Sequence, residues 1–182
     1  AKHDAGEFLQ AVLESKATLM RWMPWCHASY GAADVDRWFE TADQMWTNQT
    51  AFPMLIRSKT DGTLLGGAGL QDVLLYGKRE AELGYWVRKS ARGRGVASTA
   101  IRAIAAFAFN ELKLVRASMR IRLDNASSRR AAERAVFRVP GLPQPLPRGG
   151  PGGPPRRARR WRAEASPDRR HVSTLGVENE EL

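Results

Sequence analysis

The sequence has one cysteine and no long apolar run. Cys26 has no second cysteine with which to pair, which excludes an internal disulfide and indicates a reducing compartment. A membrane-spanning helix needs roughly 20 apolar residues in a row, and no run in this chain approaches that length. The first residues also lack the charged-then-apolar pattern of a signal peptide. We therefore expect a soluble, cytoplasmic protein with no membrane partner.

Histidine is also scarce. The chain contains His3, His27 and His171, which have neither the spacing of zinc ligands nor a nucleophile as partner in the sequence. The sequence therefore predicts no metal site.

Charge and proline are concentrated near the C-terminus. The 182 residues carry a formal net charge of +10, and the stretch from Arg138 to Arg170 holds nine arginines, two acidic residues and eight of the ten prolines. Prolines do not fit helix interiors or sheet ladders, and this stretch has neither a helical nor a strand period. We predict one folded domain over residues 1–137 and an irregular or disordered tail over residues 138–182.

Hydrophobic periodicity divides the first 137 residues into helices and strands. It predicts helices over residues 4–15 and 33–48, separated by a loop that Pro24 and Gly31 interrupt. Three antiparallel strands, a helix, a fourth strand and a last helix should follow. Their predicted ranges are 52–57, 64–70, 82–87, 95–112, 114–123 and 125–137. No strand pattern precedes the first helix, so we expect an α/β (α+β) sandwich that lacks a recognisable first strand.

The connection between the third and fourth strands is the most informative stretch. A strand, a helix and a strand of these lengths form a right-handed crossover, so the fourth strand should lie parallel to the third. Before the helix, Gly93 and Gly95 allow successive backbone N–H groups to converge where the helix N-terminus favours an anion. The sequence predicts a pyrophosphate site here, although a glycine pair alone is more often an ordinary turn. The fourth strand should bury Val115, Ala117, Met119, Ile121 and Leu123.

The residues from Arg92 to Ala97 match the signature R/Q-x-x-G-x-G/A, placed between a strand and a helix. In this respect the chain resembles the GNAT superfamily of N-acetyltransferases. Four further stretches extend the resemblance over residues 4–137 and point to the ribosomal-protein N-terminal, or RimJ/RimL-like, branch. They are WMPW (22–25), DGTLLGGAGL (61–70), AELGYWV (81–87) and DNASSRRAAERAVF (124–137). The resemblance implies a mixed, mostly antiparallel sheet flanked by helices.

The resemblance also implies acetyl-CoA as co-substrate and a primary amine, such as a protein N-terminus, as acceptor. The amides of residues 92–97 would hold the coenzyme pyrophosphate, and the backbone of Trp86 and Val87 would pair with its pantetheine arm. The residues implied in coenzyme binding are Trp86, Val87, Arg92, Gly93, Arg94, Gly95, Val96, Ala97, Asn125 and Ser128.

Direct attack of an amine on the thioester requires a base and a proton donor for the thiolate. The resemblance implies Glu82 as the base, directly or through a water, and Ser128 as the donor. It also places Trp22, Trp25 and Tyr30 in the loop that shapes the acceptor pocket.

Each of these side chains also has a purely structural interpretation. Glu82 can serve as a carboxylate that only pairs with a neighbour. Asn125 and Ser128 stand at a helix start, where such residues are favoured as caps. Trp22, Trp25 and Tyr30 can belong to the core.

Beyond residue 137 the sequence departs from the family, whose fold continues with a hairpin beside the acceptor site. Without that hairpin, the fourth strand would be an exposed edge and the acceptor wall would be incomplete. One hypothesis is a reading-frame shift at Val136, which would make the chain an inactive coenzyme-binding remnant. Another is RNA or ribosome binding by the arginine-rich tail through phosphate neutralisation.

Overall fold

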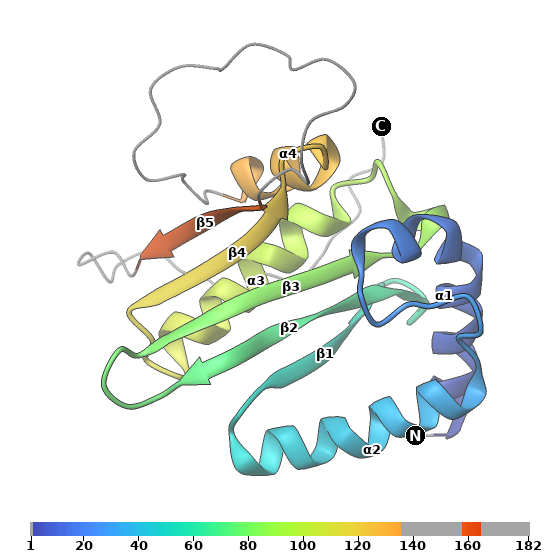
Figure 1. Cartoon of the computed structure of the whole chain (residues 1–182), viewed down its shortest axis with the longest axis horizontal. Coiled ribbons are helices and arrows are strands. Elements are labelled where there is room, and N and C mark those ends of the chain that lie inside the picture. Colours follow the sequence, from blue (N-terminus) through green and yellow to red (C-terminus); the bar gives the residue numbers. More distant parts are fainter. Residues whose placement is uncertain (1, 136–157, 165–182) are drawn as a thin grey trace.

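The computed structural model describes residues 2–135 and 158–164, with side chains for residues 4–135 (Figure 1). Its helices and strands are, in chain order, α1 (Lys2–Trp22), α2 (Ala32–Asn48), β1 (Phe52–Arg57), β2 (Leu64–Leu74), β3 (Glu80–Val87), the short 3-10 helix η1 (Lys89–Ala91), α3 (Val96–Asn110), β4 (Arg116–Arg122), α4 (Ala126–Arg134) and β5 (Ala158–Glu164). No helix in the described part of the chain is long and apolar enough to cross a membrane.

The five strands form one mixed sheet in the order β1-β2-β3-β4-β5. The strands β1, β2 and β3 make an antiparallel meander, as the alternation and turn residues predicted. The crossover through α3 places β4 parallel to β3, which confirms the second topological prediction. β5 runs antiparallel to β4 and forms the edge of the sheet. The predicted fold class, a mostly antiparallel sheet flanked by helices, is confirmed.

Helices cover both faces of the sheet (Figure 1). α3 and α4 share the larger core with one face, where Ile101 and Ile104 pack with Leu70 and Leu83. α1 and α2 cover the other face around Trp86. Because successive side chains of a strand point to opposite faces, the β3 neighbours Tyr85 and Trp86 belong to different cores.

The first helix is longer than the sequence predicted. We expected it to end near Ser15, but α1 continues to Trp22. Residues 16–22 contain good helix formers and no helix breaker before Pro24. Leu19 also extends the buried stripe of the helix, since it is only 3% exposed and packs in the core beneath α1. Trp22 is therefore a helix residue and not a loop residue.

The predicted inward direction of Val115 is wrong. Val115 precedes β4 and is 48% exposed, whereas Leu114 is buried in the core. The expected alternation begins only inside the strand, where Ala117, Met119 and Ile121 are all buried.

The prediction of irregular structure beyond residue 137 is wrong for residues 158–164, which form β5. This segment contains neither proline nor glycine, so every residue can join a ladder. It pairs with β4 along the whole strand, from Arg116–Glu164 to Arg122–Ala158, and so covers the edge that we expected to be exposed. The other tail residues, and the arginine side chains on which the RNA hypothesis rests, lie outside the described residues.

Candidate functional site

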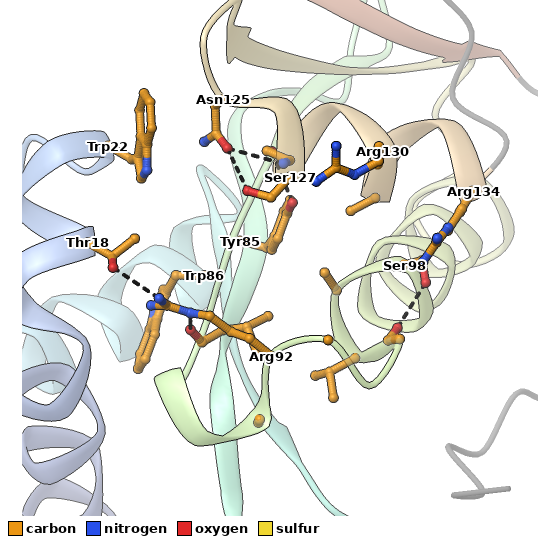
Figure 2. Close-up of a pocket in the computed structure, with 18 of the residues that line it drawn as sticks. Thr18, Trp22, Tyr85, Trp86, Arg92, Ser98, Asn125, Ser127, Arg130 and Arg134 are labelled. Atoms are coloured by element: carbon orange, nitrogen blue, oxygen red, sulfur yellow. Dashed lines mark hydrogen bonds between the residues drawn. The ribbon is translucent and has the colours of Figure 1, made fainter. Parts of the chain in front are cut away.

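The parallel strands β3 and β4 pair over only part of their lengths. Their register runs from Glu80–Arg116 to Glu82–Ser118, and no later pair joins them in the described structure, although β3 continues to Val87. A cavity of about 310 Å³ lies where the strands have separated. Its wall is made by the end of β3, the turn before α3, the start of α4 and the last turn of α1 (Figure 2).

The turn before α3 has the backbone conformation that the glycine spacing predicted. Gly93 and Gly95 have φ angles of +80° and +77°, in the left-handed region that side chains disfavour. A Cβ atom at either position would meet nothing within 4 Å, so the backbone angle and not space requires glycine. Gly95 is the N-cap of α3, and Val96, Ala97 and Ser98 of its first turn line the cavity. The free N–H groups and dipole of this helix end suit a phosphate.

Three polar side chains of α1, those of Glu14, Ser15 and Thr18, hold η1 and the turn before α3 in place. The Glu14 carboxylate accepts hydrogen bonds from Arg88 Nε at 2.5 Å and from the Ser90 amide at 2.6 Å. Ser15 Oγ accepts from the Lys89 amide at 2.9 Å. Burial raises the pKa of Glu14, but the hydrogen bonds from Arg88 and Ser90 outweigh this, and the pKa is below its ordinary value.

Arg92 makes the third connection between α1 and the turn. Its Nη1 donates to Thr18 Oγ1 at 3.0 Å, and its Nε donates to the Val87 carbonyl at 3.1 Å (Figure 2). The side chain therefore ties the turn to both α1 and the end of β3. Arg94, the other arginine of the predicted motif, is exposed and is not among the residues that line the cavity.

The start of α4 forms the opposite wall of the cavity. Asn125 is the N-cap, and its Oδ1 accepts hydrogen bonds from the Ser128 amide at 3.1 Å and from Ser127 Oγ at 3.0 Å. The capping role that we kept open is therefore present, and both Asn125 and Ser128 also line the cavity. Tyr85 points from β3 toward the start of α4 (Figure 2). Its hydroxyl donates a hydrogen bond to Ser128 Oγ at 3.0 Å.

Tyr85 is a cavity residue that sequence reasoning missed. The sequence predicted Tyr85 only as a strand residue. Its position next to Trp86, which was expected to bind the coenzyme, could have indicated a place in the site. Burial raises the pKa of Tyr85 above its ordinary value of 10.0, and the hydrogen bond to Ser128 offsets part of that rise. The phenol is therefore a neutral hydrogen-bond donor at physiological pH.

Glu82 lies at the point where β3 and β4 separate. It is 6% exposed, faces the side of the sheet opposite to Tyr85, and is not among the residues that line the cavity. Arg120 Nε lies 2.8 Å from one carboxylate oxygen and 2.7 Å from the other, and Gln71 Nε2 lies 3.3 Å from the first. The carboxylate raises the pKa of Arg120 through this hydrogen bond and its charge.

The three predicted acceptor-site aromatics have different positions. Trp22 lines the cavity, and the guanidinium carbon atoms of Arg21 and Arg122 lie 4.6 and 5.5 Å from its ring centre. Trp25 is 39% exposed and contacts the ring of Tyr30 at 5.5 Å. Tyr30 itself is buried in the core under α1, and burial raises its pKa to about 12. Only Trp22 is at the cavity.

Comparison with known proteins identifies the family and the fold. The profile of the family described as the acetyltransferase (GNAT) domain matches residues 1–138. The chain belongs to this acetyltransferase family. The expected membership of the GNAT superfamily is confirmed.

Individual GNAT proteins resemble the chain more distantly. A Bacillus subtilis protein provisionally named as the ribosomal N-acetyltransferase YdaF is 29% identical over 136 residues, which cover 74% of this chain and 72% of that protein. The structure of RimL, a ribosomal-protein alpha-N-acetyltransferase, in complex with coenzyme A has a TM-score of 0.76 at 18% identity and covers 90% of both chains. The acetyltransferase MccE, in complex with acetyl-CoA and AMP, has a TM-score of 0.75 at 19% identity over 91% of this chain and 89% of its own.

The protein is an acetyl-CoA-dependent N-acetyltransferase, and acetyl-CoA is its co-substrate. The described residues fit this molecule, because the left-handed glycines open a helix N-terminus to the cavity and Ser128 of α4 lines the same cavity. Among these residues, no group of three or more His, Cys, Asp or Glu side chains is arranged to hold a metal ion.

Proposed function

We propose that this N-acetyltransferase uses residues 1–137 to acetylate the amino terminus of a protein, such as a ribosomal protein, by direct attack of the amine on the thioester. The observation that carries the proposal is the cavity between the separated ends of β3 and β4, bounded by the glycine turn and by Ser128. The names of YdaF and RimL support the choice of a protein N-terminus.

The donor is held by backbone groups in this proposal. The amides from Arg92 to Ala97 bind the pyrophosphate, and the backbone of Trp86 and Val87 pairs with the pantetheine arm where β4 has left β3. Trp86 is fixed for this task because its ring contacts that of Phe8 edge-on at 5.5 Å. Acetyl-CoA supplies an activated acyl group with a thiolate as leaving group.

Ser128 gives a proton to the leaving thiolate and then regains one from solvent, which restores its hydroxyl. The Ser128 amide is fixed by the Asn125 cap, and Ser128 Oγ accepts the hydrogen bond of Tyr85. Because Tyr85 is the donor in that bond, the Ser128 hydroxyl keeps its own proton for another acceptor in the cavity. Tyr85 therefore positions Ser128 and does not itself contact the reacting atoms.

Glu82 takes the proton from the attacking amine through a water molecule. The carboxylate lies where the paired part of β3 and β4 ends, and it faces the side of the sheet opposite to Tyr85. Removal of the amine proton and protonation of the thiolate are separate proton transfers, so the base and the acid can lie on different faces of the strand. A water relay is proposed because the carboxylate does not line the cavity itself.

Trp22 lies at the acceptor side of the cavity. Asp124 lies 3.9 Å from Arg21 and 3.3 Å from Arg122, so the Trp22 ring is bounded by charged groups from α1 and from the β4–α4 turn. A peptide backbone offers both an apolar edge and polar groups to such a rim.

The test is an acetylation assay over a panel of amines that reports the free thiol of coenzyme A. The panel contains peptides with the N-terminal sequences of ribosomal proteins, copies of each peptide with a blocked amino terminus, spermidine and an aminoglycoside. We expect thiol release with some free peptides and none with their blocked copies. Transfer only to spermidine or the aminoglycoside would contradict the acceptor class. Binding of acetyl-CoA without transfer to any amine would contradict the proposed reaction.

A further inference from the structure

Two arginines of α4 face the cavity, and the functions described so far do not use them. Arg130 and Arg134 are four residues apart, which places them on one face of the helix, and both line the cavity together with Ser98 at the start of α3. Figure 2 shows both side chains projecting from the cavity side of α4.

The neighbouring arginines donate hydrogen bonds, whereas the guanidinium groups of Arg130 and Arg134 have none within the described part of the chain. Arg92 donates to Thr18, and Arg102 donates to the Arg134 carbonyl at 3.3 Å. Arg129 donates to the Leu123 carbonyl at 3.2 Å. No hydrogen bond or ion pair of the Arg130 or Arg134 guanidinium occurs with any residue that the structure describes.

The described residues that line the cavity carry no negative charge to balance these two cations. No Asp or Glu is among the described residues that line it, and the first turn of α3 contains no acidic residue. Two like charges four residues apart on a helix repel each other. An anionic ligand that bridges them removes this repulsion, and the planar guanidinium suits a phosphate because it can donate two parallel hydrogen bonds.

Coenzyme A carries two separate anionic groups, the pyrophosphate and a monoester phosphate on the ribose 3′ position. The glycine turn provides amides for the pyrophosphate, so the second group needs a second site. We infer that Arg130 and Arg134 bind the ribose 3′-phosphate and make the protein select coenzyme A over its 3′-dephospho form. This inference rests on the coenzyme site described above.

The experiment is a calorimetric titration of the full chain with acetyl-CoA and with 3′-dephospho acetyl-CoA. We expect the wild-type protein to bind acetyl-CoA roughly tenfold more tightly than the dephospho form, as befits an exposed charge-assisted contact. The double variant Arg130→Ala and Arg134→Ala should bind both donors equally, with the affinity that the wild type has for the dephospho form. The ratio of the two dissociation constants is therefore the readout.

Arg129→Ala is the control, because it removes one positive charge from the same helix at a position outside the cavity. It should keep the wild-type ratio. A second double variant, Arg130→Lys and Arg134→Lys, retains the charge and should keep part of the preference. A thermal melt of each variant without ligand identifies any folding defect.

Three results would overturn the inference. A wild type with no preference would exclude a 3′-phosphate subsite. A double alanine variant that loses affinity for both donors equally would show that the arginines serve the pyrophosphate. A variant that keeps the full preference would place the 3′-phosphate elsewhere. If the wild type bound neither donor, the coenzyme site itself would fail, which is a distinct outcome.

Discussion

The two ends of the cavity are built on different principles. The donor end is a single run of chain from Arg88 to Ser98, shaped by two left-handed glycines and by a helix N-terminus. The proposed catalytic end combines side chains from separate segments. Tyr85 of β3 and Ser128 of α4 line the cavity, whereas Glu82 of β3, paired with Arg120 of β4, lies outside its lining. A backbone site depends on conformation, whereas a side-chain site depends on single polar atoms. Mutations at the donor end should therefore change affinity for acetyl-CoA, and mutations at the catalytic end should change kcat.

The largest effect is expected from Glu82→Gln. A positioned base typically contributes about 10²- to 10⁴-fold, and we expect kcat to fall by roughly 10²- to 10³-fold with the dissociation constant of acetyl-CoA unchanged. The matched control is Glu80→Gln, because Glu80 lies on the same strand and face and pairs with Arg116 of β4. Steady-state kinetics with a peptide acceptor, combined with calorimetry, checks both values. Equal losses of kcat in the two variants would assign Glu82 a structural role only.

The second effect concerns the glycine turn. Valines at positions 93 and 95 would be forced into the left-handed region, at about 1–3 kcal/mol each, and we expect the dissociation constant of acetyl-CoA to rise roughly 30-fold. Gly62→Val is the control, since Gly62 also has a positive φ of +74° and open space around its Cβ position but lies in the β1–β2 turn. Gly62→Val should lower the free energy of unfolding by about as much as each valine in the turn does, and it should leave the affinity for acetyl-CoA unchanged. A similar loss of affinity in both proteins would contradict a local phosphate site.

The third effect separates Ser128 from Tyr85. Loss of the proton donor in Ser128→Ala should lower kcat by roughly 20-fold, because a thiolate needs less help to leave than an alkoxide. Tyr85→Phe should lower kcat by about fivefold, and the double variant should equal Ser128→Ala, since Tyr85 acts only through Ser128. Tyr76→Phe, at a residue that is 91% exposed, is the control. If the loss of kcat in the double variant equalled the product of the two single losses, Tyr85 would act independently of Ser128.

The smallest effect is expected at Glu14, which supports the donor end from α1. Its pKa is lowered in the folded state, so the stabilisation is fully present above the ordinary value of 4.5 and is lost as the pH falls below it. Glu14→Gln should lower the free energy of unfolding by about 1 kcal/mol at neutral pH, and the difference from wild type should shrink as the pH falls below 4.5. Urea unfolding at several pH values measures this, with the exposed Glu40→Gln as control. If the difference in unfolding free energy between wild type and Glu14→Gln stayed constant with pH, the charged hydrogen bonds of Glu14 would not be its cause.

The donor end was predictable from the sequence, because its determinants are local. Two glycines one residue apart, between an alternating strand and a helical period, specify the turn without any distant contact. The crossover rule then placed β4 beside β3. The motif also included Arg94, which does not line the cavity. The glycine spacing specifies the backbone conformation of the turn but not the direction of the arginine side chains.

The catalytic end was only partly predictable, because its partners are far apart in the chain. The hydrogen bond from Tyr85 to Ser128 spans 43 positions, and the one from Arg120 to Glu82 spans 38. No periodicity encodes such pairs. The hydrogen bond from Arg88 to Glu14 of α1, which spans 74 positions, was missed for the same reason. The sequence also did not predict that α1 extends to Trp22, which places this residue at the cavity.

Hydrogen–deuterium exchange of the full chain, with and without acetyl-CoA, tests the central claim most directly. If the backbone of the glycine turn and of β3 holds the donor, the coenzyme should slow exchange at the amides from Arg92 to Ser98 and at Trp86 and Val87. The amides of α2 and β1, which do not line the cavity, should exchange at the same rate in both states. Unchanged exchange at the turn, or protection confined to other segments, would contradict the account.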